Sequence, residues 1–391
     1  MAGGGCRGVN SSLDRSGAAP PPLRRAVAVG LSAHPRTAAA QEYAMSAPAR
    51  PATDRQQETA AVARLLRDAL GPVDVVAVTA LTGGLYNTAR RVELADGRRL
   101  VLKCAPAASL PALTHETGLL GTERRFHRLA AATGVRVPEV IHHQPADAPG
   151  PADRPGAPGE WLLLEYLDGT TWDHEKEHLG ADQRAGLRRR LGETAARIAT
   201  VTGPEFGYPQ ATDPALRGAD WPTAFGRMFA AVLADAERFG VPLPADPAVL
   251  GALPARFARE LAEVRRPALV HFDAWEGNVI LAPSADGWEF AGLIDGERAF
   301  FGDPLAELVG LDALGTPEDE DPDLLAGYRS VMPGLVLDRA ARVRLALYRI
   351  YLALIMRVEA APRGYAPDHT AWLAEWSAQR TAEQLAVLDA G

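Results

Sequence analysis

A loop in the second half of the chain places a histidine, a carboxylate and an amide at close spacing. His271 is followed by Asp273 and then by Asn278, and an apolar segment further on ends at Asp295. Phosphoryl transfer needs a carboxylate that orients or deprotonates the incoming hydroxyl, and oxygen ligands that hold Mg²⁺ beside a triphosphate. We therefore predict that Asp273 is the catalytic carboxylate and that Asn278 and Asp295 bind Mg²⁺. His271 is predicted to brace this catalytic loop by hydrogen bonds.

Each of these residues also has an ordinary structural explanation. A buried histidine is most often a hydrogen-bonded core residue, and an aspartate after a strand is most often a turn or cap residue. The order and spacing of the set, rather than any one residue, therefore carry the prediction.

A second set of residues, far upstream, could hold phosphate groups. Gly83 and Gly84 lie in a turn between two strand-like segments, with Asn87 just beyond, and exposed backbone N–H groups in such a turn can bind phosphate oxygens. Two glycines in a hairpin are by themselves a weak signal. Lys103 follows two strands later, and strand geometry points it to the same face as Val101. A lysine on an inward face needs an anion, which phosphate or a carboxylate could supply.

Two glutamates on the following helical segment are candidate partners for Lys103. Glu123 and Glu116 both lie in the segment 114–133, and either would be assigned to a solvated helix face if the lysine were absent. The residue pattern alone leaves the choice between them open.

The elements that must position these residues fall into two groups. Residues 55–70 and 114–133 have helical apolar spacing, and strands are expected at 73–81, 88–94, 98–104, 137–143 and 161–167. The Pro- and Gly-rich residues 145–159 predict a long hairpin loop. The remainder is mostly helical, at 182–202, 220–240, 246–264, 303–313, 338–360 and 367–389. A sheet-rich first third is thus followed by a helix-rich remainder.

Composition restricts the possible partners. The 391 residues carry a formal net charge of −8, which repels a phosphate backbone and makes nucleic acid an unexpected partner. Only two cysteines occur, so a disulfide framework is excluded and a cytoplasmic setting is expected. No apolar run reaches the ~20 residues of a membrane span. Composition leaves the oligomeric state open.

The first 50 residues differ from the rest in composition and in hydrophobic pattern. They are rich in Gly, Ala, Pro and Ser without periodicity, and we predict that residues 1–50 are a disordered leader. Arg24-Arg25 before an apolar stretch loosely resembles a twin-arginine export signal, which is the less favoured alternative. Met45 is a second possible start of the protein.

Taken together, these motifs resemble those of the aminoglycoside phosphotransferase and choline kinase-like enzymes, small-molecule relatives of protein kinases. The family pattern His-x-Asp-x-x-x-x-Asn is matched at 271–278, and Ile294–Pro304 is similar to the family's second pattern, with Gly296 in place of the usual Trp. The family helix commonly has a Glu fifteen residues before a Val-Pro, a position that Glu123 occupies relative to Pro138. The resemblance thus favours Glu123 over Glu116 as the partner of Lys103.

The resemblance implies an α+β, bilobal protein kinase-like fold. A small antiparallel-sheet N-lobe with one helix (51–168) would bind the nucleotide, and a larger, mostly helical C-lobe (169–391) would hold the metal and the acceptor. It also implies Mg²⁺ and ATP, or GTP, as the co-substrate. Trp161–Leu167 resembles the strand and hinge that bind adenine, so Glu165, Tyr166 and Leu167 are implied at the nucleotide.

The acceptor is expected to be a small molecule. Gly302-Asp-Pro304 follows Asp295 too closely for a peptide-binding activation segment, which argues against a protein kinase. The resemblance favours an aminoglycoside-like antibiotic, and hence antibiotic resistance. An aminosugar, a fructosamine, choline or another amino alcohol are alternatives, as is an inactive nucleotide-binding module. The possible acceptor-binding residues are Trp275, Glu297 and Asp173.

Three further patterns have weaker interpretations. His174–His178 matches the zinc peptidase signature H-E-x-x-H, but its charged neighbours favour a polar segment. The acidic residues from Glu318 to Asp323 could line a cationic acceptor and are more simply a solvated loop. Trp372 and Trp376 could stack on a sugar, although we favour a place in the core.

Overall fold

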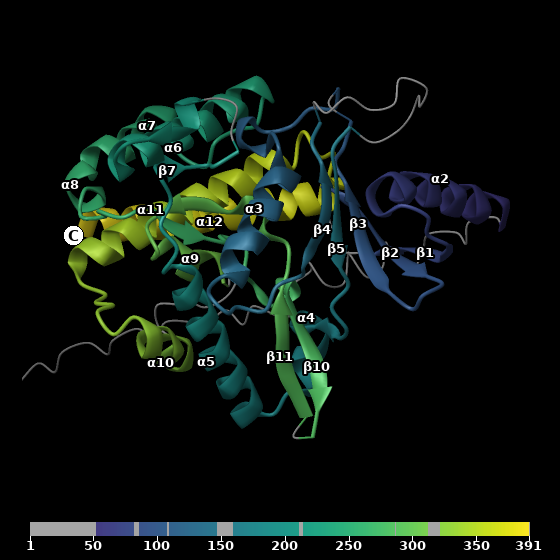
Figure 1. The fold of residues 1–391 in the computed structure, drawn as a ribbon. Coiled ribbons are helices and arrows are strands. Elements are labelled where there is room, and N and C mark those ends of the chain that lie inside the picture. The colour runs from purple at the N-terminus through teal and green to yellow at the C-terminus, as the bar shows by residue number, and fades with distance from the viewer. Residues whose placement is uncertain are drawn as a thin grey trace, which may run out of the picture. The chain divides into compact units, whose positions relative to one another are not determined.

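The structure, a computed structural model, describes residues 52–81, 86–107, 109–146, 159–210, 214–285, 287–311 and 321–390. The predicted leader, Gly83, Gly84 and the first part of the acidic run lie outside the described residues. Within the described chain, a sheet-bearing N-terminal lobe (α2 to β5) precedes a mostly helical C-terminal lobe (β6 to α12), as Figure 1 shows.

The N-terminal lobe is built on one antiparallel sheet with the order β1-β2-β3-β5-β4. Its elements are α2 (Ala52–Leu70), β1 (Val75–Leu81), β2 (Thr88–Leu94), β3 (Arg99–Cys104), η1 (Thr114–Glu116), α3 (Leu119–Ala131), β4 (Val140–Gln144) and β5 (Trp161–Glu165). Alternate residues of β3 and β5 face opposite sides. Leu102 and Leu163 pack with Leu66 of α2, whereas Leu162 packs with Leu120 of α3, so the two helices cover opposite faces.

The C-terminal lobe consists of helices with short strands between them. Its elements are β6 (Thr170–Thr171), α4 (Trp172–Glu175), η2 (Lys176–His178), α5 (Ala181–Ile198), β7 (Phe206–Gly207), η3 (Pro214–Leu216), β8 (Arg217–Gly218), α6 (Trp221–Arg238), α7 (Pro247–Arg256), α8 (Ala258–Leu261), β9 (Ala268–Val270), η4 (Glu276–Asn278), β10 (Val279–Ser284), β11 (Gly287–Leu293), η5 (Gly296–Arg298), β12 (Phe300–Gly302), α9 (Ala306–Gly310), α10 (Pro322–Val331), α11 (Arg339–Glu359) and α12 (Pro367–Ala390).

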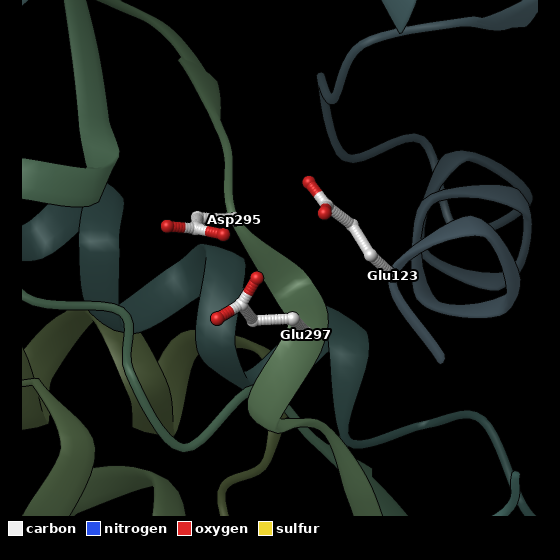
Figure 2. Close-up of side chains that lie close together, drawn as sticks. All are labelled: Glu123, Asp295 and Glu297. Atoms are coloured by element: carbon white, nitrogen blue, oxygen red, sulfur yellow. The ribbon is translucent and has the colours of Figure 1, made fainter. Parts of the chain in front are cut away.

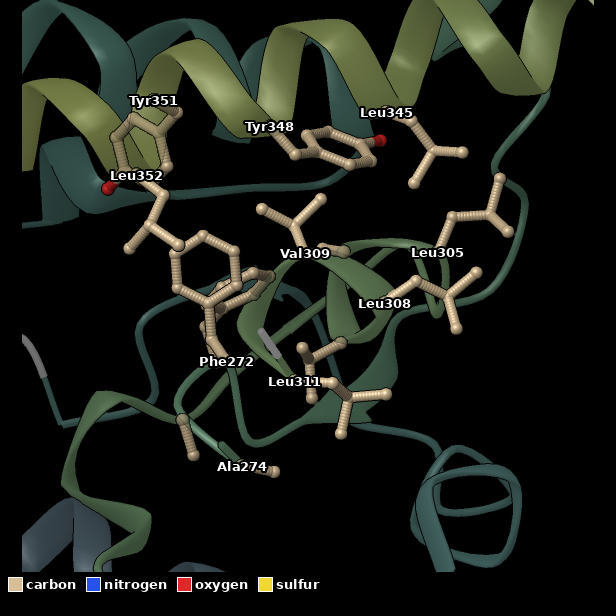
Figure 3. Close-up of a cluster of buried hydrophobic side chains, with 14 of the residues drawn as sticks. Phe272, Ala274, Leu305, Leu308, Val309, Leu311, Leu345, Tyr348, Tyr351 and Leu352 are labelled. Carbon is tan, nitrogen blue, oxygen red and sulfur yellow. The ribbon is translucent and has the colours of Figure 1, made fainter. Parts of the chain in front are cut away.

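The core of this lobe surrounds α11, which is buried on nearly every side along its middle. Tyr348 and Tyr351 of α11 are 1% exposed, as a helix in the middle of a large core should be. Figure 3 shows these rings beside Val309 of α9 and Phe272 of the loop after β9. The predicted catalytic loop is therefore attached to the core by its own apolar side chain, that of Phe272.

The predicted α+β, two-lobed fold is confirmed, with local differences. The helix expected at 246–264 is divided into α7 and α8, with Pro254 near the end of the first. Helix α10 was not predicted, because the acidic residues before it indicated a loop. The lobe boundary at 168/169 stays a prediction.

Glycine is required at residue 169, just after that boundary. Its φ is +143°, and a Cβ on it would lie 2.1 Å from the carbonyl oxygen of Leu281.

Among the described residues, the structure contains no helix that is both long and apolar enough to cross a membrane.

Candidate active site

The loop between β9 and η4 holds His271 and Asp273 in a fixed arrangement. The imidazole of His271 is fully buried, and burial lowers its pKa to about 4, so the ring is neutral near pH 7. Its Nδ1 accepts the backbone N–H of Asp273 (3.2 Å), which leaves Nε2–H to donate to the carbonyl of Ile294 (3.0 Å). The ring thus joins the two segments that carry Asp273 and Asp295. Its role as a brace in the reaction stays a prediction.

Strained backbone lies on this loop and at the end of β11. Phe272 and Asp295 have φ of +63° and +65°, and they are the two non-glycine residues with positive φ among those described. The Glu307 carboxylate supports the first turn by accepting the N–H of His271 (2.6 Å). Gly310 provides room for it, because a Cβ there would lie 2.5 Å from the carbonyl carbon of Phe272.

Asn278 is oriented by the same loop. Its Nδ2 donates to the backbone carbonyl of Asp273 (2.7 Å), and its side chain is largely buried. The amide oxygen is the group that remains for a cation. The assignment of Asn278 to Mg²⁺ stays a prediction.

Lys103 connects the two lobes. Its Nζ lies 2.8 Å from both carboxylate oxygens of Glu123 on α3 and 2.6 Å from Oδ1 of Asp295. Burial alone would lower the pKa of Lys103, but the charges of Asp295 and Glu123 outweigh it and raise the pKa. Burial would likewise raise the pKa of Asp295, but Lys103 holds it below its usual value. The alternative partner, Glu116, binds Arg363 instead.

Glu297 lies beside Asp295 and Glu123 and completes a cluster of three carboxyl groups. Figure 2 shows Glu297, Asp295 and Glu123 directed toward one another, and one ligand oxygen from each lies within 4.8 Å of the others. Burial and the neighbouring Asp295 raise the pKa of Glu297 to about 8. Asn87, which we expected at the phosphates, donates its Nδ2 to Oε2 of Glu297 (2.5 Å). Clustered carboxylate oxygens match the ligand preference of Mg²⁺.

Arg298 is a candidate functional residue that sequence reasoning missed. Its Nε lies 3.6 Å from Oδ2 of Asp273, and its Nη2 lies 2.7 Å from Oε2 of Glu359. Burial alone would lower the pKa of Arg298, but Glu359 and Asp273 keep it raised. The Arg298 guanidinium thus lies between the carboxylates of Asp273 and Glu359. Its position three residues after Asp295 was the available signal.

The predicted hinge lies at the end of β5. The Glu165 carboxylate accepts two hydrogen bonds from Arg136 (2.5 and 2.8 Å). Its side chain is therefore bound to another residue of the N-terminal lobe. The backbone N–H of Tyr166 donates to the carbonyl of Arg99 (3.1 Å), and Leu167 is mostly buried. The contribution of these residues to nucleotide binding stays a prediction.

On the predicted acceptor side, helix α4 packs against η4. Asp173 accepts from Lys176 (2.8 Å), which offsets its charge. The indole of Trp275 lies over Gly277, where a Cβ would come within 2.2 Å of the ring. The acceptor role of Asp173 and Trp275 stays a prediction, and Glu297 lies in the carboxylate cluster described above.

The residues of the H-E-x-x-H sequence lie at the end of α4 and in η2. The side chains of His174 and His178 are 60% and 71% exposed, and both hydrogen-bond the Glu175 carboxylate between them. Here the glutamate binds both rings, whereas a zinc peptidase requires it to stand apart as a base.

The described end of the acidic run is structural. Asp321 caps α10 by accepting the N–H of Leu324 (2.9 Å), and it pairs with Arg188 of α5. Asp323 pairs with Arg189 of the same helix.

The two C-terminal tryptophans lie at the edge of the core. Trp372 and Trp376 stack on each other and pack against the main apolar cluster.

A family model and a sequence relative each match most of this chain. The family model described as "Phosphotransferase enzyme family" matches residues 77–348. The "Probable ketoamine kinase YniA" of Escherichia coli K12 is 26% identical over 302 residues, which cover 75% of this chain and 91% of that protein.

Solved structures share the fold. A putative fructosamine-3-kinase from Thermobifida fusca aligns with a TM-score of 0.56 and 22% identity, over 82% of this chain and 98% of that one. A thermostable mutant of aminoglycoside phosphotransferase APH(4)-Ia aligns with a TM-score of 0.53 and 18% identity, over the same shares of the two chains.

Proposed function

The chain belongs to the phosphotransferase enzyme family, and on that premise we propose which residues of this small-molecule kinase carry the transfer and what it phosphorylates. The observation that carries the proposal is the convergence of Lys103, Glu123 and Asp295 within one ion-paired group. The N-terminal lobe supplies two members and the C-terminal lobe supplies the third.

In the proposed reaction, the family's nucleoside triphosphate lies between the lobes. Lys103, held by Glu123, contacts its phosphates. Asn278, Asp295 and Glu297 would hold Mg²⁺, which neutralises charge on the phosphate oxygens when bound.

Asp273 orients the acceptor hydroxyl and takes its proton. The hydroxyl oxygen then attacks the γ-phosphorus, the bond from that phosphorus to the bridging oxygen breaks, and ADP leaves. Arg298 holds the Asp273 carboxylate in position for the acceptor.

We infer that the acceptor is a ketoamine, which is an adduct of a sugar and an amine. Its support is that the matched Escherichia coli relative, named a probable ketoamine kinase, aligns over 91% of its length. The aminoglycoside predicted from sequence is the second candidate, supported by the likeness to APH(4)-Ia. Both classes are polyols with amino groups, so the two share a hydroxyl acceptor and a positive charge. The charged residues that the proposed reaction needs are all present, which favours an active enzyme over an inactive nucleotide-binding module.

A direct test compares acceptors. ADP release from MgATP is measured with fructoselysine, kanamycin and choline, using Asp273→Asn as the inactive control. Fructoselysine should give a kcat/KM at least about 10-fold above that of kanamycin. A preference for kanamycin would replace the ketoamine with an aminoglycoside. Nucleotide binding without turnover on any of the three would favour the binding module.

A further inference from the structure

Four buried side chains alternate in charge between the catalytic loop and the N-terminal lobe. We name this set, Arg298, Glu359, Arg363 and Glu116, the arginine–glutamate chain. Nη2 of Arg298 lies 2.7 Å from Oε2 of Glu359, that oxygen lies 3.3 Å from Nη2 of Arg363, and Arg363 pairs with Glu116. The exposed fractions of the four side chains are 13%, 1%, 7% and 1% in that order.

One end of the arginine–glutamate chain is the catalytic carboxylate. The guanidinium of Arg298 faces Asp273 through Nε and Glu359 through Nη2. Nε and Nη2 lie on the same edge of the planar guanidinium, so a contact that fixes Nη2 also fixes the direction of Nε. Glu359 therefore determines how Arg298 presents its charge to Asp273.

The other end anchors the segment that leads into α3. Thr114 donates both its N–H and its hydroxyl to Asp235 of α6 (2.7 and 2.8 Å). His115 stacks on Tyr208 with ring centroids 5.2 Å apart. The next residue, Glu116, is held by Arg363.

Three consecutive residues of the N-terminal lobe are thus fastened to the C-terminal lobe. Helix α3 begins at Leu119, three residues after Glu116, and carries Glu123 to Lys103. Because only Thr117 and Gly118 separate the anchored segment from the helix, its attachment restricts where α3 can lie.

Arg363 also contacts Tyr86, which lies just before β2 and just after the predicted glycine turn. Its Cζ lies 4.9 Å from the ring centroid of Tyr86, within the range of a cation–π contact. Asn87, the next residue, donates to Glu297 in the carboxylate cluster. One guanidinium therefore contacts two separate parts of the N-terminal lobe.

The two middle residues of the arginine–glutamate chain, Glu359 and Arg363, lie beyond the residues that the family model matches. Glu359 ends α11 and Arg363 lies in the following turn, whereas the family match ends at residue 348. Burial alone would lower the pKa of Arg363, but Glu359 and Glu116 outweigh it and keep the arginine charged. Two arginines and two glutamates also balance, so the set can be buried without net charge.

We propose that Glu359 and Arg363 are positioning residues for phosphoryl transfer. Glu359 aims Arg298 at Asp273, while Arg363 fastens Glu116 and Tyr86 and so holds α3 with Glu123 in place. Neither residue touches the reacting atoms. The kinetic part of this inference rests on the proposed function of Asp273, and the part concerning α3 does not.

The first test needs no acceptor. Hydrogen exchange of the α3 amides is compared between the wild type and the charge-balanced double variant Glu116→Gln/Arg363→Gln. Exchange within Leu119–Ala131 should be at least about 10-fold faster in the double variant. The matched control is Glu193→Gln/Arg197→Gln, a surface pair of α5, which should leave α3 unchanged. Unchanged exchange in the first double variant would overturn the attachment of α3.

The second test separates aiming from simple stability. With MgATP and fructoselysine, or kanamycin if that proves the better acceptor, Glu359→Gln should lower kcat by about 10-fold or more and leave KM for ATP within about twofold. Glu359→Asp should restore part of kcat. Equal losses in both variants, or no loss, would overturn the aiming role.

The two tests also distinguish this inference from the proposed function. If Glu359→Gln does not fold, the kcat of Glu116→Gln/Arg363→Gln decides in its place, with a loss supporting the inference and a normal kcat overturning it. If the wild type transfers phosphate to no acceptor, the proposed function fails, and hydrogen exchange alone decides whether Arg363 holds α3.

Discussion

Gly296 and Phe126 lie so close together that a Cβ on residue 296 would come 2.2 Å from Cδ1 of the Phe126 ring. The family pattern usually has a tryptophan at this place, one residue after Asp295. Here the aromatic ring is provided by α3 instead, and it also packs edge-on against His271 with centroids 4.7 Å apart. The absence of a side chain at 296 allows α3 to approach and Glu123 to reach Lys103.

We predict that Gly296→Ala lowers the free energy of unfolding by about 1–3 kcal/mol, because the new methyl group overlaps a buried ring. Urea denaturation measures this. Gly186→Ala is the matched control, since a Cβ there meets nothing within 4 Å and helix α5 should gain slightly. The double variant Gly296→Trp/Phe126→Ala should be more stable than the single variant Gly296→Trp, because the tryptophan ring can then occupy the space of the Phe126 ring. Equal stability of the two would show that the rings do not replace each other.

Lys103→Met should damage both nucleotide use and stability. The substitution leaves Glu123 and Asp295 without their shared cation, which costs about 3–5 kcal/mol. We expect kcat/KM for ATP to fall by about 100-fold or more. Mg²⁺ should raise the Tm of the variant more than that of the wild type, because the ion takes over part of the charge. Unchanged ATP kinetics would remove Lys103 from the site.

His271 should make the fold sensitive to acid. Its pKa is about 4 in the folded protein and about 6.5 in the unfolded chain, so the unfolded state binds more protons between these values. This contribution to stability is complete above pH 6.5 and is lost as the pH falls toward 4, with a total of about 3 kcal/mol.

Thermal unfolding across that pH range tests the histidine. His271→Gln should show a flatter fall in Tm than the wild type, whereas His174→Gln, on an exposed turn, should keep the wild-type slope. The same slope in all three proteins would exclude His271 as the source.

Arg298→Lys should lower kcat by about 10-fold, with KM for ATP nearly unchanged, because an ammonium lacks the two nitrogens in fixed directions that face Asp273 and Glu359. Steady-state kinetics at saturating acceptor measure this. Wild-type turnover in the lysine variant would mean that charge alone, without geometry, is sufficient at this position.

The sequence was most informative where neighbours along the chain determine the geometry. The spacing of His271, Asp273 and Asn278 places all three in one loop, and alternation in β3 sends Lys103 to the face of α3. These are local rules, so a single sequence is enough to apply them. The family assignment and the two-lobed fold predicted from them are confirmed, while the individual residue roles stay predictions.

The sequence was least informative where distant segments meet. Glu359 and Arg363 contact residues far away along the chain, and no local pattern distinguishes the two from surface charges. Helix α10 was missed for a different reason. Asp321 before Pro322 is a helix-start signal, but the neighbouring acidic residues suggested a loop, and the arginines of α5 that neutralise Asp321 and Asp323 are visible only in the fold.

The central claim is that Asp273 carries phosphoryl transfer. The most direct measurement is the transfer of labelled γ-phosphate from MgATP to fructoselysine, or to kanamycin if that is the better acceptor, by the wild type and by Asp273→Asn, with nucleotide binding measured in parallel. We predict that the variant binds ATP with a Kd within about threefold of the wild type and loses at least about 1,000-fold in kcat. Near-normal transfer by Asp273→Asn would contradict the account.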